Sequence, residues 1–591
     1  MSETEALLGV QHSVLGNRWE ERACDQRLAY TLSQRHQLPE IVGRVMAARG
    51  VDLDSAAAYL DPSLKGLMPN PSVLKDMDKA AARMADAIAA KEPVGIIGDY
   101  DVDGATSTSL LILYGRYLGL KFLHHIPDRM KEGYGPSKIG VRKLHDAGSR
   151  LLITVDCGVA AFESLALAKE LNLDTLILDH HAAEARLPEA FAVVNPNRLD
   201  DESGLNSLAA VGVTFLFLVA VNRTLRERGF FTDKLAEPNL IHFLGLVALG
   251  TICDVVALQG LNRAFAQQGL KVLAQRTNPG LSALADVAKV DERPTAYHAG
   301  FVFGPRINAG GRIGESGSGT ALLTEFDPER AFNMAVSLNT LNKERQSMEM
   351  AILEEARNKA EELDQDSPLI LVSGEGWHPG IIGIVASRLK DVFQRPALVI
   401  GLDGDVGKGS GRSIRGVDLG AAVIAARQSG LLEAGGGHAM AAGLTVSRDK
   451  LPELSKFLET HVSKQLPAEG IVPRLRSDGV ITADSIDMQM FEAMERLEPF
   501  GAGNEEPRLV LSRVRIDKAD VVGTNHVRCF LSGASGRRLK AIAFRAMDRE
   551  LGPFLLGQQG QIAHICGKIR RDNWGGNNAL QLFIDDAAKI S

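Results

Sequence analysis

Residues 96–107 read IIGDYDVDGATS, and this stretch decides the fold class. An apolar run ends at Asp99, and two further aspartates, Asp101 and Asp103, follow at alternate positions before a glycine. The pattern begins like an EF-hand calcium loop, in which the twelfth position must be a bidentate glutamate. Counted from Asp99, that position is Leu110, and the residues before the loop have the pattern of a strand rather than a helix. A calcium loop is therefore disfavoured, and a solvated acidic turn is the plain alternative.

Three more short apolar runs follow, and each closes on a polar residue. They are LLITVD (151–156), LDTLILD (173–179) and FAVVNP (191–196). A segment with helical periodicity, FESLALAKEL (162–171), separates the first two runs, and this alternation is typical of a mostly parallel sheet covered by helices on both faces. Ligands bind such sheets at the carboxyl ends of the strands. The sequence therefore predicts an α/β core with a functional site at that edge.

Acidic and imidazole side chains gather at this predicted edge. Asp156 ends one run, Asp179 ends the next and leads into His180 and His181, and Asp254 follows the apolar segment LGLVALGTIC. Carboxylates about 4 Å apart repel each other by about 4 kcal/mol at an effective dielectric of about 20, so several can share a crevice only with a cation. Oxygen-rich sites with one or two imidazoles suit Mn²⁺ or Mg²⁺, and a pair of such ions can promote hydrolysis of a phosphate ester. Another pair of histidines, at positions 124 and 125, has no acid before it and is expected to be structural.

The chain of 591 residues is too long for one core, and its pattern of apolar residues and turns changes along its length. Asp327 and Pro328 can begin a helix that meets no glycine or proline up to Ser367, which would be about 50 Å long. Near the C-terminus, five short alternating strands separated by Gly- and Asn-rich turns indicate a small β-barrel. The predicted parts are an irregular N-terminal arm (1–40) that leads into a helix near Glu40, the α/β core with a helical extension (41–325), the connecting helix (326–367), a second α/β lobe (368–466) and the barrel (467–591).

Composition restricts the function classes. Hydrophobic residues make up 45% and charged residues 24% of the chain, as in an ordinary globular protein. The five cysteines show no CxxC spacing, the N-terminus does not resemble a secretory signal, and the most apolar segment is too short to span a bilayer, so a cytoplasmic protein is expected. The net charge of −7 argues against binding of nucleic acid through the overall charge of the protein. Any contact with nucleic acid must therefore be local.

The motifs resemble those of the DHH phosphoesterase superfamily, which is named for the triplet that stands here as Asp179, His180 and His181. Its four motifs occur in order as GDYDVDGATS, TVDCGV, LDHH and GTICDVV. More narrowly, the chain from about residue 40 is similar to the bacterial single-strand-specific 5′→3′ DNA exonucleases of that superfamily. This narrower similarity rests on RMKEGYG (129–135), AAVGVTF (209–215), GPRINAGGRIG (304–314), WHPGIIGIVASR (377–388), GKGSGRSIRG (407–416) and GGGHAMAAG (435–443). The resemblance implies that the second lobe is DHHA1-like and that the barrel is OB-like.

The resemblance also implies a catalytic centre with two divalent ions, Mn²⁺ or Mg²⁺. Asp101 would hold one ion, Asp103, His180 and Asp254 would hold the other, and Asp156 would bridge them.

His181 would lie against the scissile phosphate as a hydrogen-bond donor or proton carrier, so that it and the bridging Asp156 are the expected catalytic residues. Many relatives have a histidine at the position of Ile97, and here the first ion would depend on Asp99 instead.

The Gly-rich stretch GKGSGRS is open to two interpretations from its residues alone. It can be a flexible turn, or a phosphate site at which backbone N–H groups approach an anion while Ser410 and Arg412 reach it. The resemblance favours phosphate binding and implies a DNA path lined by Arg129, Tyr134, Arg306, Ser410, Arg412 and His438. Trp574 in the barrel could stack a base or be an ordinary exposed turn residue.

The sequence thus predicts a metal-dependent exonuclease that degrades single-stranded DNA 5′→3′ to mononucleotides. The resemblance implies DNA repair and recombination as its setting, with single-strand-binding protein and a helicase as partners of a monomer. A hydrolase of oligoribonucleotides, cyclic dinucleotides or pyrophosphate is one alternative, which the barrel and the chain length disfavour. A catalytically silent DNA-binding scaffold is another, which the retained acids of all four motifs disfavour.

Overall fold

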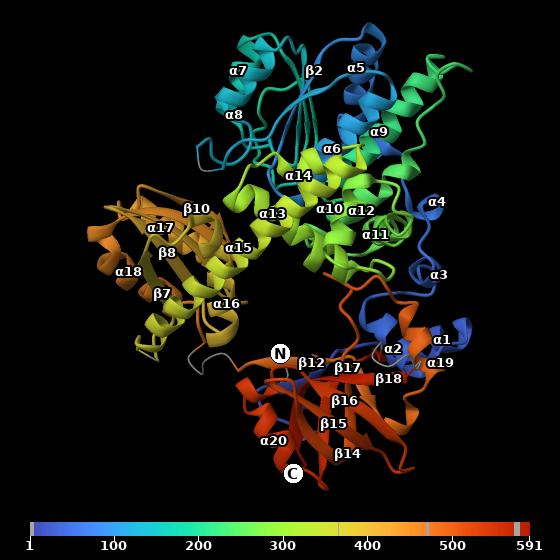
Figure 1. Ribbon diagram of the computed structural model, residues 1–591, viewed down its shortest axis with the longest axis vertical. Helices are drawn as coiled ribbons and strands as arrows, with labels where there is room; N and C mark the ends of the chain where they lie inside the picture. Colours follow the sequence, from blue (N-terminus) through green and yellow to red (C-terminus); the bar gives the residue numbers. More distant parts are fainter. Residues whose placement is uncertain (1–4, 130, 365, 468–471, 573–578, 591) are drawn as a thin grey trace.

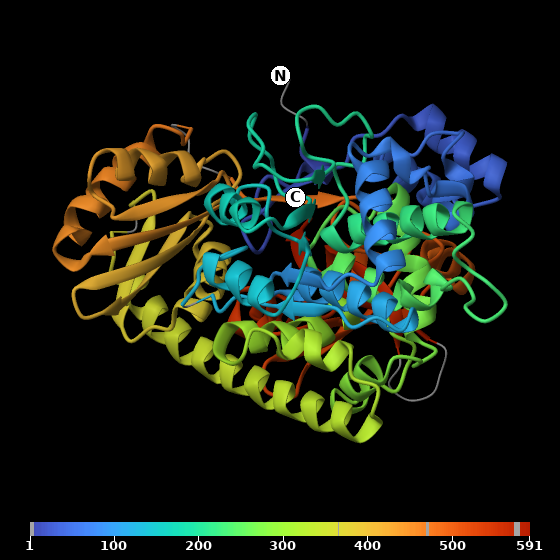
Figure 2. The same cartoon turned by 90° about the horizontal axis from the view of Figure 1, so that it is seen from above.

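The computed structural model describes residues 5–129, 131–364, 366–467, 472–572 and 579–590. Figure 1 shows an α/β core in blue and green, a second lobe in yellow and orange, and a C-terminal barrel in orange and red, placed like the corners of a triangle. The long helix α15 (Pro328–Glu361) runs from the core to the second lobe and lies along one side of the molecule in Figure 2. No helix in the described part of the chain combines the length and apolar character needed to cross a bilayer.

The core is built on a five-stranded parallel sheet, as predicted. The four expected strands are present, and a fifth strand at the edge, which contains His124 and His125, was not expected. The central strands are buried along their whole length, which explains why they appear in the sequence as continuous apolar runs. The sheet order is β3 (Leu123–His125), β2 (Val94–Gly98), β4 (Leu151–Val155), β5 (Asp174–Leu178) and β6 (Ala192–Val194).

Helices cover this sheet and extend it toward α15. Helix α6 is buried on almost every side because it follows the central strand β2 and packs against α9 and α10. The helices of the core are α5 (Met77–Ala90), α6 (Val102–Tyr117), α7 (Lys138–Asp146), α8 (Phe162–Glu170), α9 (Ala210–Glu227), η3 (Leu240–Phe243), α10 (Leu244–Cys253), α11 (Gly260–Leu273), α12 (Pro279–Val287), the π-helix η4 (His298–Phe303), α13 (Gly304–Ile313) and α14 (Ser318–Leu323).

The connecting helix confirms its sequence signals. The Asp327 side chain accepts a hydrogen bond of 2.9 Å from the Arg330 amide, and the 34 residues of α15 span about 51 Å at 1.5 Å per residue. The helix ends at Glu361, six residues before the predicted limit at Ser367.

The second lobe has a mixed sheet with helices α16 (Pro379–Phe393), α17 (Leu419–Gln428) and α18 (Leu451–Ser463). Strands β7 and β8 are parallel and the other pairs are antiparallel. The order is β10 (Ala434–His438), β11 (Ala441–Ser447), β9 (Val406–Arg412), β8 (Ala397–Asp403) and β7 (Ile370–Glu375).

All five predicted strands of the C-terminal part are present, and they close into a barrel through pairing of the first with the fourth. A short strand, β13 (Gly479–Ile481), joins the barrel alongside β14. The barrel strands are β14 (Leu509–Val522), β15 (His526–Ser532), β16 (Arg538–Ala543), β17 (Ile562–Asp572) and β18 (Ala579–Lys589), accompanied by α19 (Met488–Glu495) and α20 (Leu551–Gly557).

The N-terminal residues do not form an irregular arm, and that prediction was wrong. Strand β1 (Arg18–Glu21) pairs in parallel with β12 (Arg474–Ser477), and Trp19 is fully buried, with its indole Nε1 donating to Asp586 Oδ2 at 3.0 Å. Such a short strand has no signal of its own in the sequence because its pairing partner lies far along the chain. Helix α1 (Gln26–His36) follows, and α2 (Glu40–Ala48) begins at the predicted residue. The N-terminus is therefore part of the barrel region.

Candidate metal centre and phosphate-binding face

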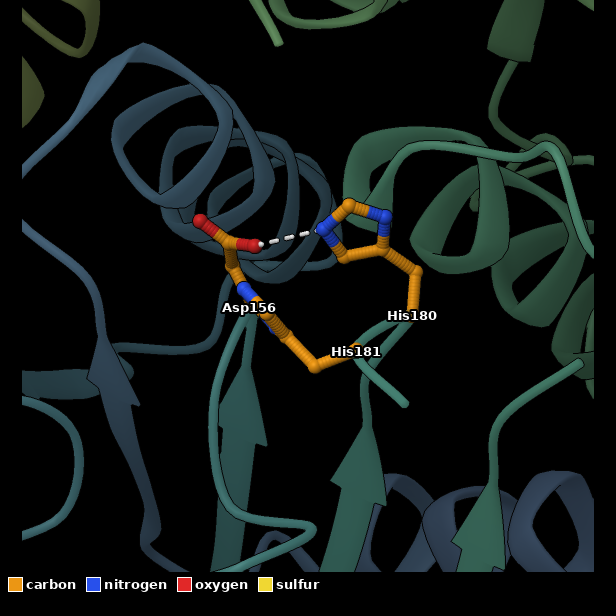
Figure 3. Close-up of side chains that lie close together, drawn as sticks. All are labelled: Asp156, His180 and His181. Atoms are coloured by element: carbon orange, nitrogen blue, oxygen red, sulfur yellow. Dashed lines mark ion pairs between the residues drawn. The ribbon is translucent and has the colours of Figure 1, made fainter. Parts of the chain in front are cut away.

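Three aspartates directly follow three neighbouring strands of the core sheet. Asp99 follows β2, Asp156 follows β4 and Asp179 follows β5, so that their side chains meet at the carboxyl edge of the sheet. Asp156 has φ of 59°, in the left-handed region that non-glycine residues seldom adopt. In Figure 3 its carboxylate and the His180 ring point toward each other, with Oδ1 and Nε2 3.3 Å apart.

The first ligand set consists of Asp99, Asp101 and Asp156. One carboxylate oxygen from each lies within 4.8 Å of the others. Asp101 caps α6 and accepts a hydrogen bond of 3.0 Å from the Gly104 amide. Asp99 is 3% exposed, and its Oδ1 has no hydrogen-bond partner among the described residues. Burial, followed by the charge of Asp101, raises the pKa of Asp99 to about 8.

The second ligand set consists of Asp103, His180 and Asp254. Asp103 accepts hydrogen bonds of 2.7 Å and 2.9 Å from the amides of Ala210 and Val211 at the start of α9. Burial and then the charge of Asp254 raise the pKa of Asp103 to about 7. Burial and then the charge of Asp101 raise that of Asp254 to about 7 as well. Asp254 is held by the end of helix α10 rather than by a strand.

His180 has the geometry of an imidazole ligand. Its Nδ1 lies 3.1 Å from the Leu208 carbonyl oxygen, which leaves Nε2 as the ligand nitrogen. That Nε2 is buried without a hydrogen-bond partner in the described chain and lies 3.9 Å from Asp103 Oδ2. Burial, followed by the charges of Asp101 and Asp103, raises the pKa of Asp156 well above its usual range.

The residues present therefore fit divalent cations. The buried carboxylates have raised pKa values, and one carboxylate oxygen and one imidazole nitrogen lack a hydrogen-bond partner among the described residues. Positive charge at this one place would stabilise all of these groups. The donors are carboxylate oxygens with one or two imidazoles, the set that suits Mn²⁺ or Mg²⁺.

His181 lies beside this centre and is oriented by Asp179. The ring Nδ1 is 2.8 Å from Asp179 Oδ1, and its Nε2 is 3.0 Å from the hydroxyl of Tyr134, which in turn donates to the Asp156 carbonyl at 3.2 Å. Burial disfavours the charged ring, but the hydrogen bond with Asp179 and its charge outweigh this and raise the pKa of His181 to about 9.

Asp179 is the site residue to which sequence reasoning gave no function. Its Oδ2 accepts from the Val159 amide at 3.0 Å, and its Oδ1 accepts from the His180 amide at 2.7 Å. Although its burial opposes ionisation, these bonds and the His181 ring lower the pKa of Asp179. Its place at a strand end, directly before two histidines, was the available signal.

The Gly-rich stretch of the second lobe is strand β9, which corrects both interpretations of it. It is not a flexible turn, and its backbone pairs with β8 on one side and β11 on the other, so its N–H groups are not free to receive an anion as predicted. Its glycines face the lobe's interior, where a Cβ at Gly409 would lie 2.7 Å from Leu444 Cδ1. An anion can therefore meet only side chains there, and Arg412 Nη1 donates to Ser410 Oγ at 3.2 Å.

Other predicted phosphate-binding residues are only partly brought together. His438 pairs with Ala441, and Ala441 pairs with Arg412, so the three side chains form one row across the sheet. Arg129 is exposed and lies over the Tyr100 ring, 5.2 Å from its centroid. Burial, and next the charge of Arg129, lowers the pKa of Arg412, so the two guanidinium groups interact electrostatically.

Arg306 lies on α13, where it donates to the Val302 carbonyl at 2.6 Å and to Asn339 Oδ1 at 3.1 Å. Two residues that interact electrostatically with Arg129 were not predicted, although both lie within motif stretches. Arg312 donates to the Gly380 carbonyl at 3.0 Å, and the pKa of His378 is lowered by burial and then by Arg129. Trp574 lies outside the described residues.

His124 and His125 lie on the edge strand β3 and were expected to be structural. His125 Nε2 lies 3.0 Å from Glu132 Oε2, which supports that role for His125. His124 is exposed, and its assignment stays a prediction.

Family models match three parts of the chain. Residues 93–251 match the DHH family, N-terminal domain, residues 366–464 match the DHHA1 domain, and residues 477–586 match the RecJ OB domain. The fold and the acidic centre thus define a DHH-type protein with DHHA1 and OB domains.

The chain is 34% identical to the single-stranded-DNA-specific exonuclease RecJ of Bacillus subtilis, with 97% of this chain and 71% of that protein covered. It is also 34% identical to RecJ of Escherichia coli, over 93% of this chain and 96% of that protein. This chain belongs to the RecJ family.

The solved structure of Thermus thermophilus RecJ in complex with Mn²⁺ is similar in fold. It superposes with a TM-score of 0.81 at 27% sequence identity, covering 97% of this chain and 79% of that one. A structure of the same protein in complex with Mg²⁺ gives a TM-score of 0.74 at 26% identity, covering 97% of this chain and 78% of that one.

Proposed function

We propose that this chain is a metal-dependent exonuclease that degrades single-stranded DNA 5′→3′ to mononucleotides, in DNA repair and recombination. The observation that carries the proposal is the pair of ligand sets at the carboxyl edge of the core sheet, in which Asp156 of the first set lies 3.3 Å from His180 of the second. Its relatives in Bacillus subtilis and Escherichia coli bear the name of single-stranded-DNA-specific exonucleases, which supports the same substrate here.

The two ligand sets suggest how the ions would be held. Asp99 and Asp101 would bind one ion, with Asp99 in place of the histidine that is absent at Ile97. The set of Asp103, His180 and Asp254 would bind the other, and Asp156 would lie between them. Bound Mn²⁺ or Mg²⁺ would supply an activated water and neutralise charge on the phosphodiester.

The protein's own groups would position the substrate around this centre. His181, protonated at neutral pH because its pKa is about 9, would donate from Nε2 to an oxygen of the scissile phosphate. Asp179 would keep the His181 ring charged and in the correct orientation. The hydroxyl of Tyr134 and the substrate would both lie on the Nε2 side of that ring.

The basic residues of the two lobes would bind the phosphates that follow. Arg129, Ser410 and Arg412 would meet the strand near the centre, with Arg306 and His438 farther along and Tyr134 beside His181. The two lobes would form a channel that admits a single strand but not a duplex, and the barrel, including Trp574, would hold the strand beyond it. The boundaries of the core, connecting helix, second lobe and barrel given above belong to the same proposal. So do a monomeric state, a cytoplasmic setting, and association with single-strand-binding protein and a helicase.

The test gives the purified protein 5′-labelled single-stranded DNA, duplex DNA, short RNA and a cyclic dinucleotide, each with Mn²⁺ or Mg²⁺. We expect mononucleotides from single-stranded DNA and little product from duplex DNA. Equal rates on the two forms of DNA would argue against the channel. Preference for the cyclic dinucleotide would favour a small-substrate hydrolase, and no product with either ion would favour a silent scaffold.

A further inference from the structure

Two exposed aromatic rings stack on each other beside the metal centre. Tyr297 and Phe301, at the start and inside of the π-helix η4, are 61% and 73% exposed, with centroids 5.5 Å apart and planes at 25°. Single exposed aromatic residues are common on protein surfaces, but a stacked pair on a π-helical turn is unusual. Short π-helical segments occur frequently at functional sites.

The turn that carries this pair is fixed to the end of helix α10, where Asp254 lies. The Cys253 thiol donates to the Ala299 carbonyl at 3.4 Å, and a Cβ placed on Gly304 would come within 2.6 Å of the Cys253 sulfur. On the other side, Arg306 donates to the Val302 carbonyl at 2.6 Å. The stacked pair therefore has a fixed position between a metal-binding aspartate and an arginine expected to bind phosphate.

A line of planar groups also lies on the barrel and begins with Arg570. This guanidinium donates hydrogen bonds of 2.7 Å and 2.6 Å to Glu506, and these bonds, with a weaker electrostatic interaction with Tyr297, raise its pKa. The same guanidinium lies 4.8 Å from the centroid of Phe583, and Phe583 lies 5.3 Å from Phe544.

The line ends with the His526 ring, 5.2 Å from Phe544. The barrel is held against the core at this junction, because the Leu258 amide donates to the Ala502 carbonyl at 2.8 Å and Arg263 donates to the Glu498 carbonyl at 2.7 Å. The planar groups of the two domains thus keep a defined relation to each other.

We propose that Tyr297 and Phe301 form a base-stacking step that carries single-stranded DNA from the metal centre toward the outer face of the barrel. Within each domain the neighbouring groups lie about 5 Å apart, as Tyr297 and Phe301 do on the core and Arg570, Phe583 and Phe544 do on the barrel. Aromatic rings and guanidinium groups are the groups on which unpaired bases stack irrespective of sequence. This inference rests on the proposed function and deepens it, because it assigns a subsite to the bases that follow the nucleotide being cleaved.

The test measures stacking base by base. A 5′-phosphorylated 20-nucleotide strand is bound in EDTA, so that it is not cleaved, and each of its first ten bases is replaced in turn by an abasic site. With the unmodified protein we expect one or two abasic positions to weaken binding about tenfold, as loss of a stacked base should. In the double variant Tyr297→Ala/Phe301→Ala, the intact strand should bind about tenfold to a hundredfold more weakly, and those positions should no longer matter.

Two further variants make the result specific. Tyr297→Trp/Phe301→Trp retains flat rings and should keep the abasic profile of the unmodified protein. Tyr117→Ala removes a ring that is 50% exposed on α6 and should leave both affinity and profile unchanged. Unfolding temperatures of all variants check that the fold is retained.

The inference is overturned if the double variant and the unmodified protein show the same abasic profile, which would assign the pair to a protein partner or to the fold. It is also overturned if affinity falls while the same abasic positions remain costly. Cleavage of a labelled trinucleotide with Mn²⁺ separates this failure from that of the proposed function. If the unmodified protein cleaves no single-stranded DNA, the proposed function itself fails. If it does cleave and the profiles coincide, only the stacking step is refuted.

Discussion

The sheet of the core and the sheet of the second lobe present functional residues in opposite ways. In the core, strands β2, β4 and β5 run in parallel, so the short side chains that follow them converge on one point. In the second lobe, Ser410 and Arg412 lie on strand β9 itself and His438 extends the same row. Carboxylates that converge on one point suit a cation. A row of side chains across the face of a sheet suits an extended polyanion.

The two regions are also opposite in charge, and each is unfavourable without its ligand. Burial and mutual repulsion raise the pKa values of the buried aspartates Asp99 and Asp103, while burial and the charge of Arg129 lower the pKa of Arg412. Arg129 interacts electrostatically with groups of both regions. Binding of divalent ions at one side and of phosphate at the other would relieve both conflicts and would couple cation binding to substrate binding.

The largest expected effect is that of Asp156→Asn, which removes a carboxylate of the first ligand set that also lies 3.3 Å from His180 of the second. Asparagine tolerates the left-handed backbone at this position, whereas alanine would add strain to the loss of charge. We expect the rate of single-stranded DNA cleavage to fall by about a thousandfold or more, because the ligand proposed to lie between the two ions is lost while the fold remains. The rate with saturating Mn²⁺ and the unfolding temperature check this.

The matched control for this variant is Asp174→Asn, at the amino end of β5 on the same sheet. Asp174 pairs with Arg83 at 2.7 Å, far from the carboxyl edge. Its activity should match that of the unmodified protein. Cleavage by Asp156→Asn at the unmodified rate would remove Asp156 from the centre.

The second prediction concerns the stability of the protein without divalent ions. The pKa values of Asp103 and Asp254 are about 7 in the folded protein and near 3.8 when unfolded, so between these values the folded state binds more protons. Stability should therefore decrease as pH rises from about 4 to about 7, at a maximum of about 1.4 kcal/mol per pH unit for each group.

Divalent ions should reverse this loss, because they bind the ionised carboxylates. In EDTA, the unfolding temperature should be lower at pH 8 than at pH 5, and Mn²⁺ should raise it more at pH 8. The Asp156→Asn variant should respond less to Mn²⁺. An unfolding temperature that does not respond to Mn²⁺ at pH 8 would contradict the metal centre.

The third prediction tests the basic face through Arg412→Ala. We expect single-stranded DNA to bind about tenfold more weakly, and the dependence of log affinity on log salt concentration to lose about one unit of slope. Arg448→Ala is the control, because Arg448 belongs to the same lobe but pairs with Glu375 and the Gly404 carbonyl. Equal salt slopes for the two variants would refute a phosphate contact at Arg412.

The sequence predicted the metal edge better than the basic face, and the geometry explains this. Asp99 and Asp156 end continuous apolar runs, and parallel strands bring such ends together in any fold of this class. The glycines of β9 suggested a loop, because nothing local shows that Gly409 and Gly411 pack against leucines of neighbouring elements. Pairing of β1 with β12 likewise depends on contacts between distant parts of the chain.

Gly383→Ala on α16 has the smallest expected effect. It also separates an effect on stability from an effect on DNA binding. A Cβ at this position would lie 2.9 Å from Ser410 Oγ and 3.2 Å from Arg412 Nη2, so the alanine must displace the two side chains of the basic face. Alanine within a helix is otherwise favoured over glycine by about 0.5–1 kcal/mol. The unfolding temperature should therefore stay the same or rise, while affinity for single-stranded DNA falls about threefold because Arg412 is shifted.

Gly557→Ala at the end of α20, where a Cβ meets nothing within 4 Å, should leave affinity unchanged. Unchanged affinity in Gly383→Ala as well would show that the strand does not contact Ser410 and Arg412, and that the anion-binding surface of the second lobe lies elsewhere.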